Sequence, residues 1–578
     1  MEMIHLTIDG HSVEVPKGTT VLEAARLAGI DIPTLCYLKE INEVASCRVC
    51  VVELGSRLIA SCTLVAENGM DVKTNTPAVR ESRKTVVELL LSNHKRDCTT
   101  CIRNENCSLQ KISKDLNIRD IRYEGEKNSY PIDFSSTSIT RDNEKCILCG
   151  RCINTCSKIQ SVNAINFSSR GFYTKVATQY DRPLGESSCV NCGQCIMACP
   201  VGALHEKEHI KEVWKALEDK GKYVVIQTAP AVRVALGEEF GLPIGTRVTG
   251  KMAAALKKLG FDKAFDTDFA ADLTIMEEGT EFIKRLESGK NLPIMTSCCP
   301  GWVKFVEHNF PKLLNNLSTC KSPSEMEGAL IKSYFAEKMD LDPAKIVVVS
   351  VMPCTAKKFE GNREELGSNG LKDIDYVLTT RELAQMIKEA GIDFINLPEE
   401  DFDNPFGEST GASVIFGATG GVTEAALRTI FEVISGQDLD IIEFSAVRGT
   451  LAIKEALIEL PDGRTITAAV VHGLGNARKL LEIVESGSKH YDFIEVMACP
   501  GGCVTGGGQP IVNSKLQEKV DVKLLRAKAI YDEDESMTIR KSHKNPYIKK
   551  IYKEFLKEPN GHLSHKLLHT NYAKRDKY

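Results

Sequence analysis

The chain of 578 residues lacks both long hydrophobic runs and a strong net charge. No apolar stretch approaches the roughly 18 residues that a membrane-spanning helix needs, and the N-terminus shows neither the basic nor the apolar segment of a secretory signal. The formal net charge of -5 indicates no particular partner. We therefore expect a cytoplasmic protein without a membrane or nucleic-acid partner, and the length predicts several domains.

Cysteine is missing from residues 200–297, although the whole chain contains 21 cysteines. Fifteen precede this gap and six follow it. In a large chain without a signal sequence, clustered cysteines are expected to bind metals or to act as catalytic thiols, not to form disulfides. The gap predicts a boundary between an electron-carrying half and a second half with another function.

Residues 1–80 begin with a predicted hairpin, whose strands 4–8 and 12–15 are joined through the turn signal Asp9-Gly10. A helix is predicted from Thr20 to Gly29, with apolar positions at Val21, Leu22, Ala25 and Leu27. The cysteines that follow are Cys36, Cys47, Cys50 and Cys62. Four thiolates on a loop suit a 2Fe-2S cluster, although the gap between the first two departs from the plant-type spacing. A structural zinc site is the alternative.

Residues 81–125 contain a second candidate metal site in a polar, helix-like stretch. Its ligand residues are His94, Cys98, Cys101 and Cys107. Three cysteines and one histidine can close a tetrahedral zinc site as readily as they can hold iron. The residue types alone leave the two metals open.

Residues 126–209 repeat a Cys-x2-Cys-x2-Cys-x3-Cys run that is typical of proteins with two 4Fe-4S clusters. The first run is Cys146, Cys149, Cys152 and Cys156, and the second is Cys189, Cys192, Cys195 and Cys199. In such pairs the fourth cysteine of each run binds the other cluster. We therefore expect Cys156 to join the second cluster and Cys199 the first. Ser157 replaces the proline found at Pro200 but leaves the thiols intact.

Residues 210–578 read as alternating apolar strands and amphipathic helices, which predicts an α/β domain. Strands are predicted at 223–227, 346–351, 468–472 and 493–497, and a helix at 380–390. Cysteines follow three such apolar stretches, at Cys298-Cys299, Cys354 and Cys499. Open α/β sheets place their sites beyond the carboxyl ends of strands, so these motifs are predicted to converge.

Two features lie near the C-terminus. Three glycines at 506–508 follow Cys503, a pattern that suits a backbone passing close to a bulky inorganic ligand. From Lys541 to Tyr578 there are ten Lys or Arg and three acidic residues. We favour a surface-wrapping segment over a docking site for an acidic partner.

The three late cysteine motifs together resemble the signature of the FeFe-hydrogenases. They are Thr296-Ser-Cys-Cys-Pro-Gly-Trp302, Met352-Pro-Cys-Thr-Ala-Lys-Lys-Phe-Glu360 and Met497-Ala-Cys-Pro-Gly-Gly-Cys-Val-Thr-Gly-Gly-Gly-Gln-Pro510. The resemblance covers almost the whole chain and implies the monomeric, multi-cluster clostridial type. Its expected parts are a 2Fe-2S ferredoxin-like (β-grasp) domain at 1–80, a histidine-ligated 4Fe-4S domain at 81–125, a two-cluster ferredoxin domain at 126–209 and an α/β H-cluster domain at 210–578 with a wrapping C-terminal segment.

The resemblance implies a ferredoxin hydrogenase, which reversibly reduces protons to dihydrogen with electrons from reduced ferredoxin. It implies one 2Fe-2S cluster, three accessory 4Fe-4S clusters and an H-cluster. The H-cluster joins a 4Fe-4S cubane to a diiron unit with CO, cyanide and azadithiolate, which dedicated maturation proteins build. The implied cubane ligands are Cys299, Cys354, Cys499 and Cys503, with Cys503 as the bridge to the diiron unit.

The resemblance also assigns residues around the diiron unit. Lys357 would pair with a cyanide, and the apolar wall would comprise Pro230, Met352, Phe416 and Met497. Without the resemblance, a solvated lysine and ordinary core residues are the alternatives. The implied proton relay consists of Cys298, Glu278, Glu281, Ser318 and Arg285. Because they are three residues apart, Glu278 and Glu281 can share one face of a helix. Without the resemblance, such a pair more often lies on a solvent-exposed helix surface.

Some positions depart from the family pattern. Ala231 stands where a serine is common, and Ser324-Glu325 stand where glutamines are frequent. Cys320 has no implied role and is expected to be a buried apolar thiol. Two other functions remain as alternatives, a non-catalytic iron-sulfur assembly protein and an electron carrier. The stretch from His472 to Arg478 is only a weak dinucleotide fingerprint.

Overall fold

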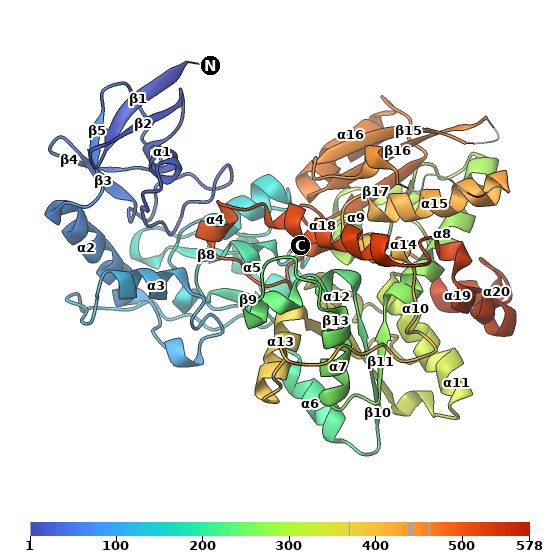
Figure 1. Ribbon diagram of the computed structural model, residues 1–578. Helices are drawn as coiled ribbons and strands as arrows, with labels where there is room; N and C mark the ends of the chain where they lie inside the picture. Colours follow the sequence, from blue (N-terminus) through green and yellow to red (C-terminus); the bar gives the residue numbers. More distant parts are fainter. Residues whose placement is uncertain (1, 369, 437, 439–442, 461–462, 578) are drawn as a thin grey trace.

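The computed structural model describes residues 2–368, 370–436, 438, 443–460 and 463–577. The N-terminal β-rich lobe and the larger α/β lobe lie side by side, with the segments of residues 81–209 joining them (Figure 1). Among the described helices, none combines the length and the apolar character of a membrane span.

The N-terminal lobe is a five-stranded mixed sheet of order β2-β1-β5-β3-β4, packed against α1 (Val21–Leu27). The strands are β1 (Met3–Ile8), β2 (His11–Pro16), β3 (Val51–Leu54), β4 (Arg57–Ala60) and β5 (Asp71–Lys73). The predicted hairpin is confirmed, because Ile8 pairs with His11 and both Asp9 and Gly10 have positive φ, as a two-residue primed turn requires. Leu27 differs from the expected apolar face, since it is 72% exposed.

Residues 77–209 contain short elements that carry the cysteine loops. They are α2 (Pro77–Asn93), α3 (Ser108–Asp115), β6 (Ile139–Arg141), α4 (Arg151–Asn154), β7 (Asn166–Ser168), β8 (Lys175–Ala177), α5 (Gln194–Ala198) and β9 (Leu204–Glu206). Gly150 and Gly193 adopt positive φ immediately before α4 and α5. Each cysteine run therefore turns into a helix in the same way, as expected for a repeated unit.

The larger lobe contains two four-stranded sheets. The first is parallel, of order β11-β10-β13-β14, with β10 (Tyr223–Thr228), β11 (Lys263–Asp266), β13 (Ile346–Met352) and β14 (Tyr376–Thr379). The second has order β12-β17-β16-β15, with β12 (Ile294–Met295), β15 (Ile453–Glu459), β16 (Thr465–His472) and β17 (Phe493–Met497). The predicted strands all lie within these sheets. Among the described strands of these two sheets, β15 alone runs antiparallel, and its alternating burial is that of an edge strand with one wet face.

Helices cover both sheets of this lobe (Figure 1). They are α6 (Ile210–Glu218), α7 (Thr249–Lys258), α8 (Asp268–Ser288), α9 (Pro300–Asn309), α10 (Pro323–Leu330), α11 (Ala336–Lys338), α12 (Ala356–Glu360), α13 (Thr380–Glu389), α14 (Gly411–Val414), α15 (Gly421–Ser435) and α16 (Leu474–Ser486). The helix predicted at 380–390 is α13, which starts with a capping box between Thr379 and Glu382.

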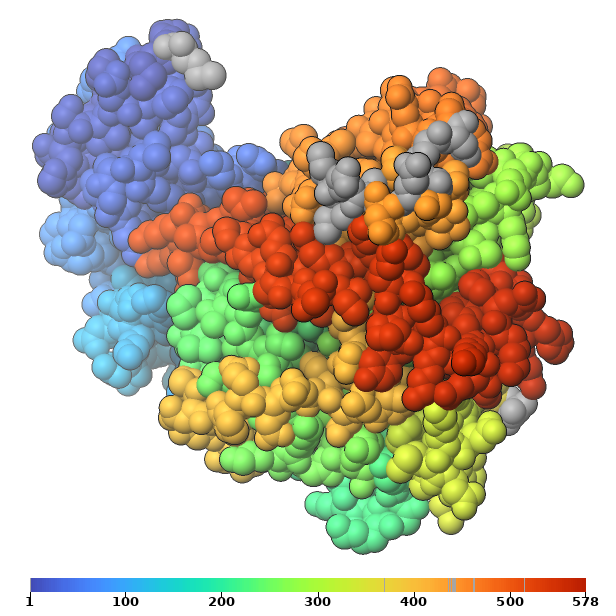
Figure 2. Space-filling model, turned by 45° about the vertical axis from the view of Figure 1, so that its right-hand side comes forward, coloured from blue at the N-terminus to red at the C-terminus, as the bar shows by residue number. Residues whose placement is uncertain are grey.

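The C-terminal segment wraps the larger lobe. Its helices are α17 (Ser514–Gln517), α18 (Val522–Ser536), α19 (Pro546–Ile551) and α20 (His562–Leu568). Figure 2 shows these residues in red across one face of the molecule. Buried contacts hold the segment in place, such as Arg526 donating to the carbonyl of Val504 at 2.8 Å and Tyr552 donating to Glu277 at 2.6 Å. The segment therefore packs against this lobe through a few buried contacts, in agreement with the prediction of a surface-wrapping segment.

Candidate functional site

The late cysteines converge where the strands end. Cys298 and Cys299 follow β12, Cys354 follows β13, and Cys499 follows β17. Cys499 interacts electrostatically with the thiols of Cys354, Cys299 and Cys503. Burial raises the pKa of Cys354 to about 12. Thiolates in such a buried pocket need a positive partner, and an iron-sulfur cluster can supply it. The donor set therefore fits a cubane.

The three glycines after Cys503 lie tightly against neighbouring backbone. A Cβ added to Gly506 would lie 2.0 Å from the carbonyl oxygen of Pro353, and one on Gly507 would lie 2.5 Å from that of Cys192. The close approach that the structure describes is to neighbouring protein backbone. Without side chains, these glycines let their loop pack between the loop of Cys354 and the loop of Cys192.

A close contact also joins the second cysteine run to the late cysteine loops. A Cβ on Gly193 would lie 2.4 Å from Oγ1 of Thr355 and 3.0 Å from Cα of Gly507. Thr355 also donates to the carbonyl of Asn191 at 2.7 Å. The backbone around Cys192 therefore touches the loops that carry Cys354 and Cys503.

Two cavities in residues 139–204 are lined by the ferredoxin cysteines. One is lined by Cys156, Cys189, Cys192 and Cys195. The other is lined by Cys146, Cys149, Cys152 and Cys199. Apolar side chains such as Ile139, Leu184 and Val201 complete the walls. The structure thus brings together the two exchanged sets that the sequence predicts, and each offers four thiols to one cubane.

The N-terminal cysteines form a tight buried group. The backbone amide of Cys36 lies 3.4 Å from Sγ of Cys47, and that of Cys47 lies 3.5 Å from Sγ of Cys36. Cys62 interacts electrostatically with Cys50, Cys36 and Cys47. Backbone N–H groups that face sulfur are typical of an iron-sulfur loop. The set fits a 2Fe-2S cluster.

The His94 set is less compact. Cys98 and Cys101 bracket a single turn, with the amide of Cys101 donating to the carbonyl of Cys98 at 3.2 Å, and Cys107 interacts electrostatically with Cys101. A Cβ on Gly202 would lie 2.6 Å from Sγ of Cys101. Among the described residues, the buried Nδ1 of His94 has no hydrogen-bond partner. A buried ring nitrogen without a hydrogen-bond partner is consistent with a metal ligand.

Comparisons with known proteins match every part of the chain. Family profiles match residues 1–77 ("2Fe-2S iron-sulfur cluster binding domain"), 83–122 ("NADH-ubiquinone oxidoreductase-G iron-sulfur binding region") and 145–203 ("4Fe-4S dicluster domain"). "Iron only hydrogenase large subunit, C-terminal domain" matches residues 222–507, and "Iron hydrogenase small subunit" matches residues 520–575.

Relatives match over the full length. The chain is 50% identical to "NADP-reducing hydrogenase subunit HndD" of Solidesulfovibrio fructosivorans, over 100% of both chains. It is 43% identical to "Iron hydrogenase 1" of Clostridium pasteurianum, over 98% of this chain and 100% of the relative. The chain belongs to the FeFe-hydrogenase family. It is therefore an iron-sulfur oxidoreductase that interconverts protons and dihydrogen.

Solved structures agree with this assignment. FeFe-hydrogenase HydA1 of Chlamydomonas reinhardtii superposes with a TM-score of 0.57 at 42% identity, over 64% of this chain and 100% of that chain. A more distant relative is "Protein NAR1" of Arabidopsis thaliana, at 31% identity over 66% of this chain and 84% of the relative. The assembly-type alternative predicts the loss of Cys298, Lys357 and the relay carboxylates, and this hydrogenase retains them.

The predicted wall residues lie around the cysteines. Phe416 and Met497 belong to one buried cluster, against which Cys298 and Cys503 pack. Met352 belongs to the other large core, against which Cys354 packs. Pro230 is buried in a short turn that contacts the turns of residues 415–417 and 503–505. All four side chains are thus inside the protein and next to cysteine-bearing loops.

Lys357 is buried, which excludes the solvated alternative. Its Nζ donates to Glu360 Oε2 and to Ser322 Oγ, each at 2.6 Å. Although burial favours the neutral amine, the carboxylate of Glu360 outweighs it and raises the pKa of Lys357. The ammonium is therefore held in place and charged. Glu360 has a functional position that sequence reasoning missed, although its spacing of three residues from Lys357 on α12 is the signal for such a pair.

The predicted relay groups also assemble. Cys298 interacts electrostatically with Glu278, and burial raises the pKa of Glu278 to about 7. Ser318 is a hydrogen-bond partner of Glu278, and its hydroxyl also donates to Glu281 at 3.4 Å. Arg285 forms an ion pair with Glu281. Because Glu278 is only 3% exposed, a wet helix surface is excluded.

The weak dinucleotide fingerprint is a packing motif. Arg478 donates to Oγ of Ser161 at 2.7 Å, and a Cβ on Gly475 would lie 2.9 Å from the carbonyl oxygen of Ile159. The glycine thus lets α16 pack against the ferredoxin segment, which leaves no reason to assign a phosphate site there.

Proposed function

We propose that Cys299, Cys354, Cys499 and Cys503 hold the H-cluster of this hydrogenase, with Cys503 as the bridging ligand. The convergence of these buried thiols at the carboxyl ends of two sheets supports the proposal. When bound, the H-cluster supplies the two-electron chemistry that reduces protons. The protein holds it by thiolate ligands, by the Lys357 ammonium and by the wall of Pro230, Met352, Phe416 and Met497.

The accessory clusters form the electron path in this proposal. The 2Fe-2S ligands are Cys36, Cys47, Cys50 and Cys62, and the ligands of the histidine-ligated 4Fe-4S cluster are His94, Cys98, Cys101 and Cys107. The two ferredoxin-type clusters use the exchanged sets that line the two cavities. The contact of Gly193 with Thr355 and Gly507 supports electron entry to the H-cluster from the Cys192 side. We keep the domain boundaries at 1–80, 81–125, 126–209 and 210–578.

Protons reach the buried site through Cys298, Glu278, Ser318 and Glu281 in this proposal. Glu278 suits a proton carrier because its pKa of about 7 lets it exchange protons near neutral pH. Arg285 orients Glu281, because it also donates to the carbonyl of Leu317 at 2.9 Å.

A hydrogenase with iron-sulfur domains exchanges electrons with a redox partner. We propose that reduced ferredoxin is this partner. We also propose that the enzyme is a cytoplasmic monomer and that maturation proteins insert its diiron unit. A second candidate is a subunit of an NADP-reducing complex, because the relative with that printed name matches over 100% of both chains. Rates of dihydrogen production with reduced ferredoxin and with NADPH, measured on the enzyme purified from its native cells, would distinguish the two. A rate with ferredoxin alone favours the first candidate, and a rate with NADPH favours the second.

The first test is dihydrogen production from reduced viologen by the anaerobically purified, matured enzyme. We expect Cys298→Ala to lose most of its rate, because removal of a positioned acid typically costs about 100-fold or more. Cys320→Ala is the matched control, since Cys320 is another buried thiol without a relay role. A Cys298→Ala enzyme with complete iron and a native rate would remove Cys298 from the relay.

A further inference from the structure

Arg285 is a poor end point for the proton relay. Its guanidinium remains charged at any physiological pH and has no lone pair to accept a proton. Its donors are already engaged by Glu281 and by the carbonyls of Asn291, Asn315, Asn316 and Leu317. Arg285 therefore positions Glu281, and another group must exchange protons between Glu281 and water.

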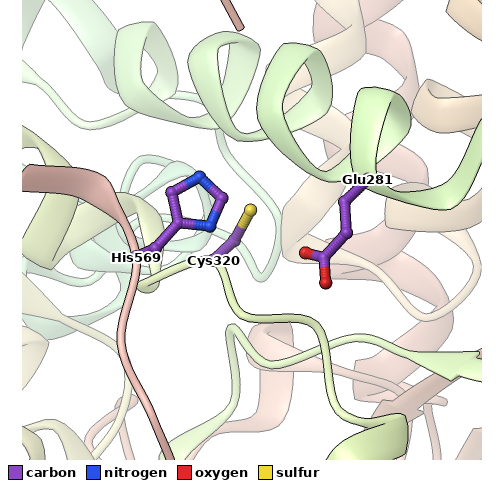
Figure 3. Close-up of side chains that lie close together, drawn as sticks. All are labelled: Glu281, Cys320 and His569. Carbon is purple, nitrogen blue, oxygen red and sulfur yellow. The ribbon is translucent and has the colours of Figure 1, made fainter. Parts of the chain in front are cut away.

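A hydrogen-bonded chain leads from Glu281 in a different direction. Oε2 of Glu281 accepts from the amide of Thr319 at 3.1 Å and from its hydroxyl at 3.0 Å. The same hydroxyl lies 2.7 Å from Nδ1 of His569. Figure 3 shows the imidazole of His569 on one side of Cys320 and the carboxylate of Glu281 on the other. A titratable imidazole thus lies one hydroxyl away from the relay.

The C-terminal segment holds this imidazole in position. His569 forms an antiparallel bridge with Cys320. The amide of Lys321 donates to the carbonyl of Leu568, and that of Thr570 donates to the carbonyl of Thr319, each at 2.8 Å. Nε2 of His569 lies 3.2 Å from Oε2 of Glu277. Both ring nitrogens therefore face defined partners, as a proton-transferring imidazole requires.

The chain also approaches the surface. The side chain of His569 is 4% exposed, and its ring lies against that of the exposed His565, with 4.3 Å between centroids and the planes tilted by 37°. The other titratable groups near this pair are Glu277, Glu281, Lys284, Cys320 and Tyr552. Burial raises the pKa values of Cys320 and Tyr552 well above their usual range, so these two groups keep their protons.

We propose that His569 is the solvent-side proton carrier of this hydrogenase and that Thr319 links it to Glu281. During dihydrogen evolution, the imidazolium gives the proton on Nδ1 to the Thr319 oxygen, and the Thr319 hydrogen passes to Oε2 of Glu281. A proton from solvent, which reaches the ring past the exposed His565, then restores the imidazolium. A carboxylate oxygen of Glu281, a ring nitrogen of His569 and Sγ of Cys320 also lie within 4.8 Å of one another, close enough to share a metal ion. The hydrogen bonds of Glu281 and His569 to Thr319 favour the proton chain. The inference rests on the proposed relay through Glu281.

The first test compares turnover in the matured enzyme with reduced viologen as donor. His569→Gln keeps a polar side chain beside Thr319 but cannot titrate, so we expect kcat to fall roughly tenfold while KM for the viologen stays unchanged. His562→Gln removes an exposed histidine from α20, the helix that ends just before His569, and serves as the control. A native kcat and pH profile in folded His569→Gln would overturn the proposal.

Chemical rescue separates proton transfer from packing. His569→Ala leaves space beside Thr319, and added imidazole is expected to restore most of the lost rate by carrying the proton in its place. A folded His569→Ala enzyme with full iron content that imidazole does not rescue would assign the loss to packing and contradict the proposal.

A third readout does not depend on turnover. In protein with ring-labelled histidine, the NMR titration of His569 is assigned from the signal missing in His569→Gln. Glu281→Gln removes a nearby negative charge, so the pKa of His569 should fall while that of His562 stays constant. No shift would show that the two groups are not coupled, which would overturn the proposal.

Glu281→Gln also separates a failure of the proposed relay from a failure of the role proposed for His569. If Glu281→Gln turns over at the native rate, the relay of the proposed function fails. If Glu281→Gln is slow and His569→Gln is native, only the assignment of His569 fails.

Discussion

At the scale of single residues, burial favours the neutral form of the Glu325 side chain, which its residue type does not suggest. It lies in the first turn of α10 and is only 2% exposed. Burial and the nearby carboxylates of Glu360 and Asp373 raise its pKa well above the usual value. A neutral carboxylic acid has nearly the shape and hydrogen-bonding capacity of the glutamine that the family often has here. A protonated Glu325 can therefore take the place of a glutamine with little change in shape or hydrogen bonding.

This interpretation predicts the behaviour of Glu325→Gln. An acid whose folded pKa is raised stabilises the fold fully below its unfolded pKa, and that stabilisation is lost as pH rises towards the folded pKa. Each pH unit in that window costs the native protein about 1 kcal/mol that the variant does not lose. We expect Glu325→Gln to keep its activity and to melt above the native protein at alkaline pH. Equal melting temperatures from about pH 5 to about pH 9 would show that Glu325 is ionised in the fold.

Glu278 predicts a pH dependence of turnover. With a pKa of about 7, its carboxyl is protonated below neutral pH and can donate inward, whereas above it is ionised. Dihydrogen evolution should therefore decline above about pH 7, and Glu278→Gln should be at least roughly 100-fold slower at every pH. Glu287→Gln, at an exposed position of the same helix, is the control. A native pH profile in Glu278→Gln would contradict the relay.

At the scale of elements, the cysteine loops hold one another in place. Gly506 is confined by the Pro353 carbonyl, so Gly506→Ala must displace the loop that carries Cys354. We expect this variant to lose H-cluster iron and melt several degrees lower, whereas the accessory clusters remain. Gly361→Ala is the control, because its Cβ would meet no atom nearer than 3.6 Å. Iron content and electron paramagnetic resonance test the expectation, and a fully loaded Gly506→Ala enzyme would refute it.

The same elements show how far sequence reasoning reaches. The hairpin at Asp9-Gly10 and the strands before Cys354 and Cys499 are predictable, because turn chemistry and apolar runs are local signals. The exchanged cysteine sets follow from spacing. The contacts of Gly506 with Pro353, and of Thr319 with His569, are not predictable in this way. They join segments that are far apart in the chain, and no local pattern records such a neighbour.

At the scale of the whole molecule, the C-terminal segment completes the site from outside. Glu277 on α8 accepts from Tyr552 and from the amide of Asn560, and Glu307 on α9 pairs with Arg575. The basic excess of this segment is thus partly matched by buried acids of the larger lobe. The segment packs on the outside of the helices that carry the relay, and a few buried hydrogen bonds and ion pairs hold it there although its sequence is polar.

The arrangement of the lobes also predicts unequal roles for the clusters. Cys192 lies in the backbone that touches Gly507, whereas Cys36 belongs to residues 1–80 and packs in the buried cluster that contains Cys149 and Cys152. Loss of the adjacent cluster in Cys192→Ala should stop electron delivery from any donor. Loss of the 2Fe-2S cluster in Cys36→Ala should leave the viologen rate within about twofold, because a small donor can reach the later clusters directly. Viologen assays on both variants, with the remaining clusters verified by electron paramagnetic resonance, test this order. A Cys192→Ala enzyme that is as active as Cys36→Ala would show that electrons enter the H-cluster by another path.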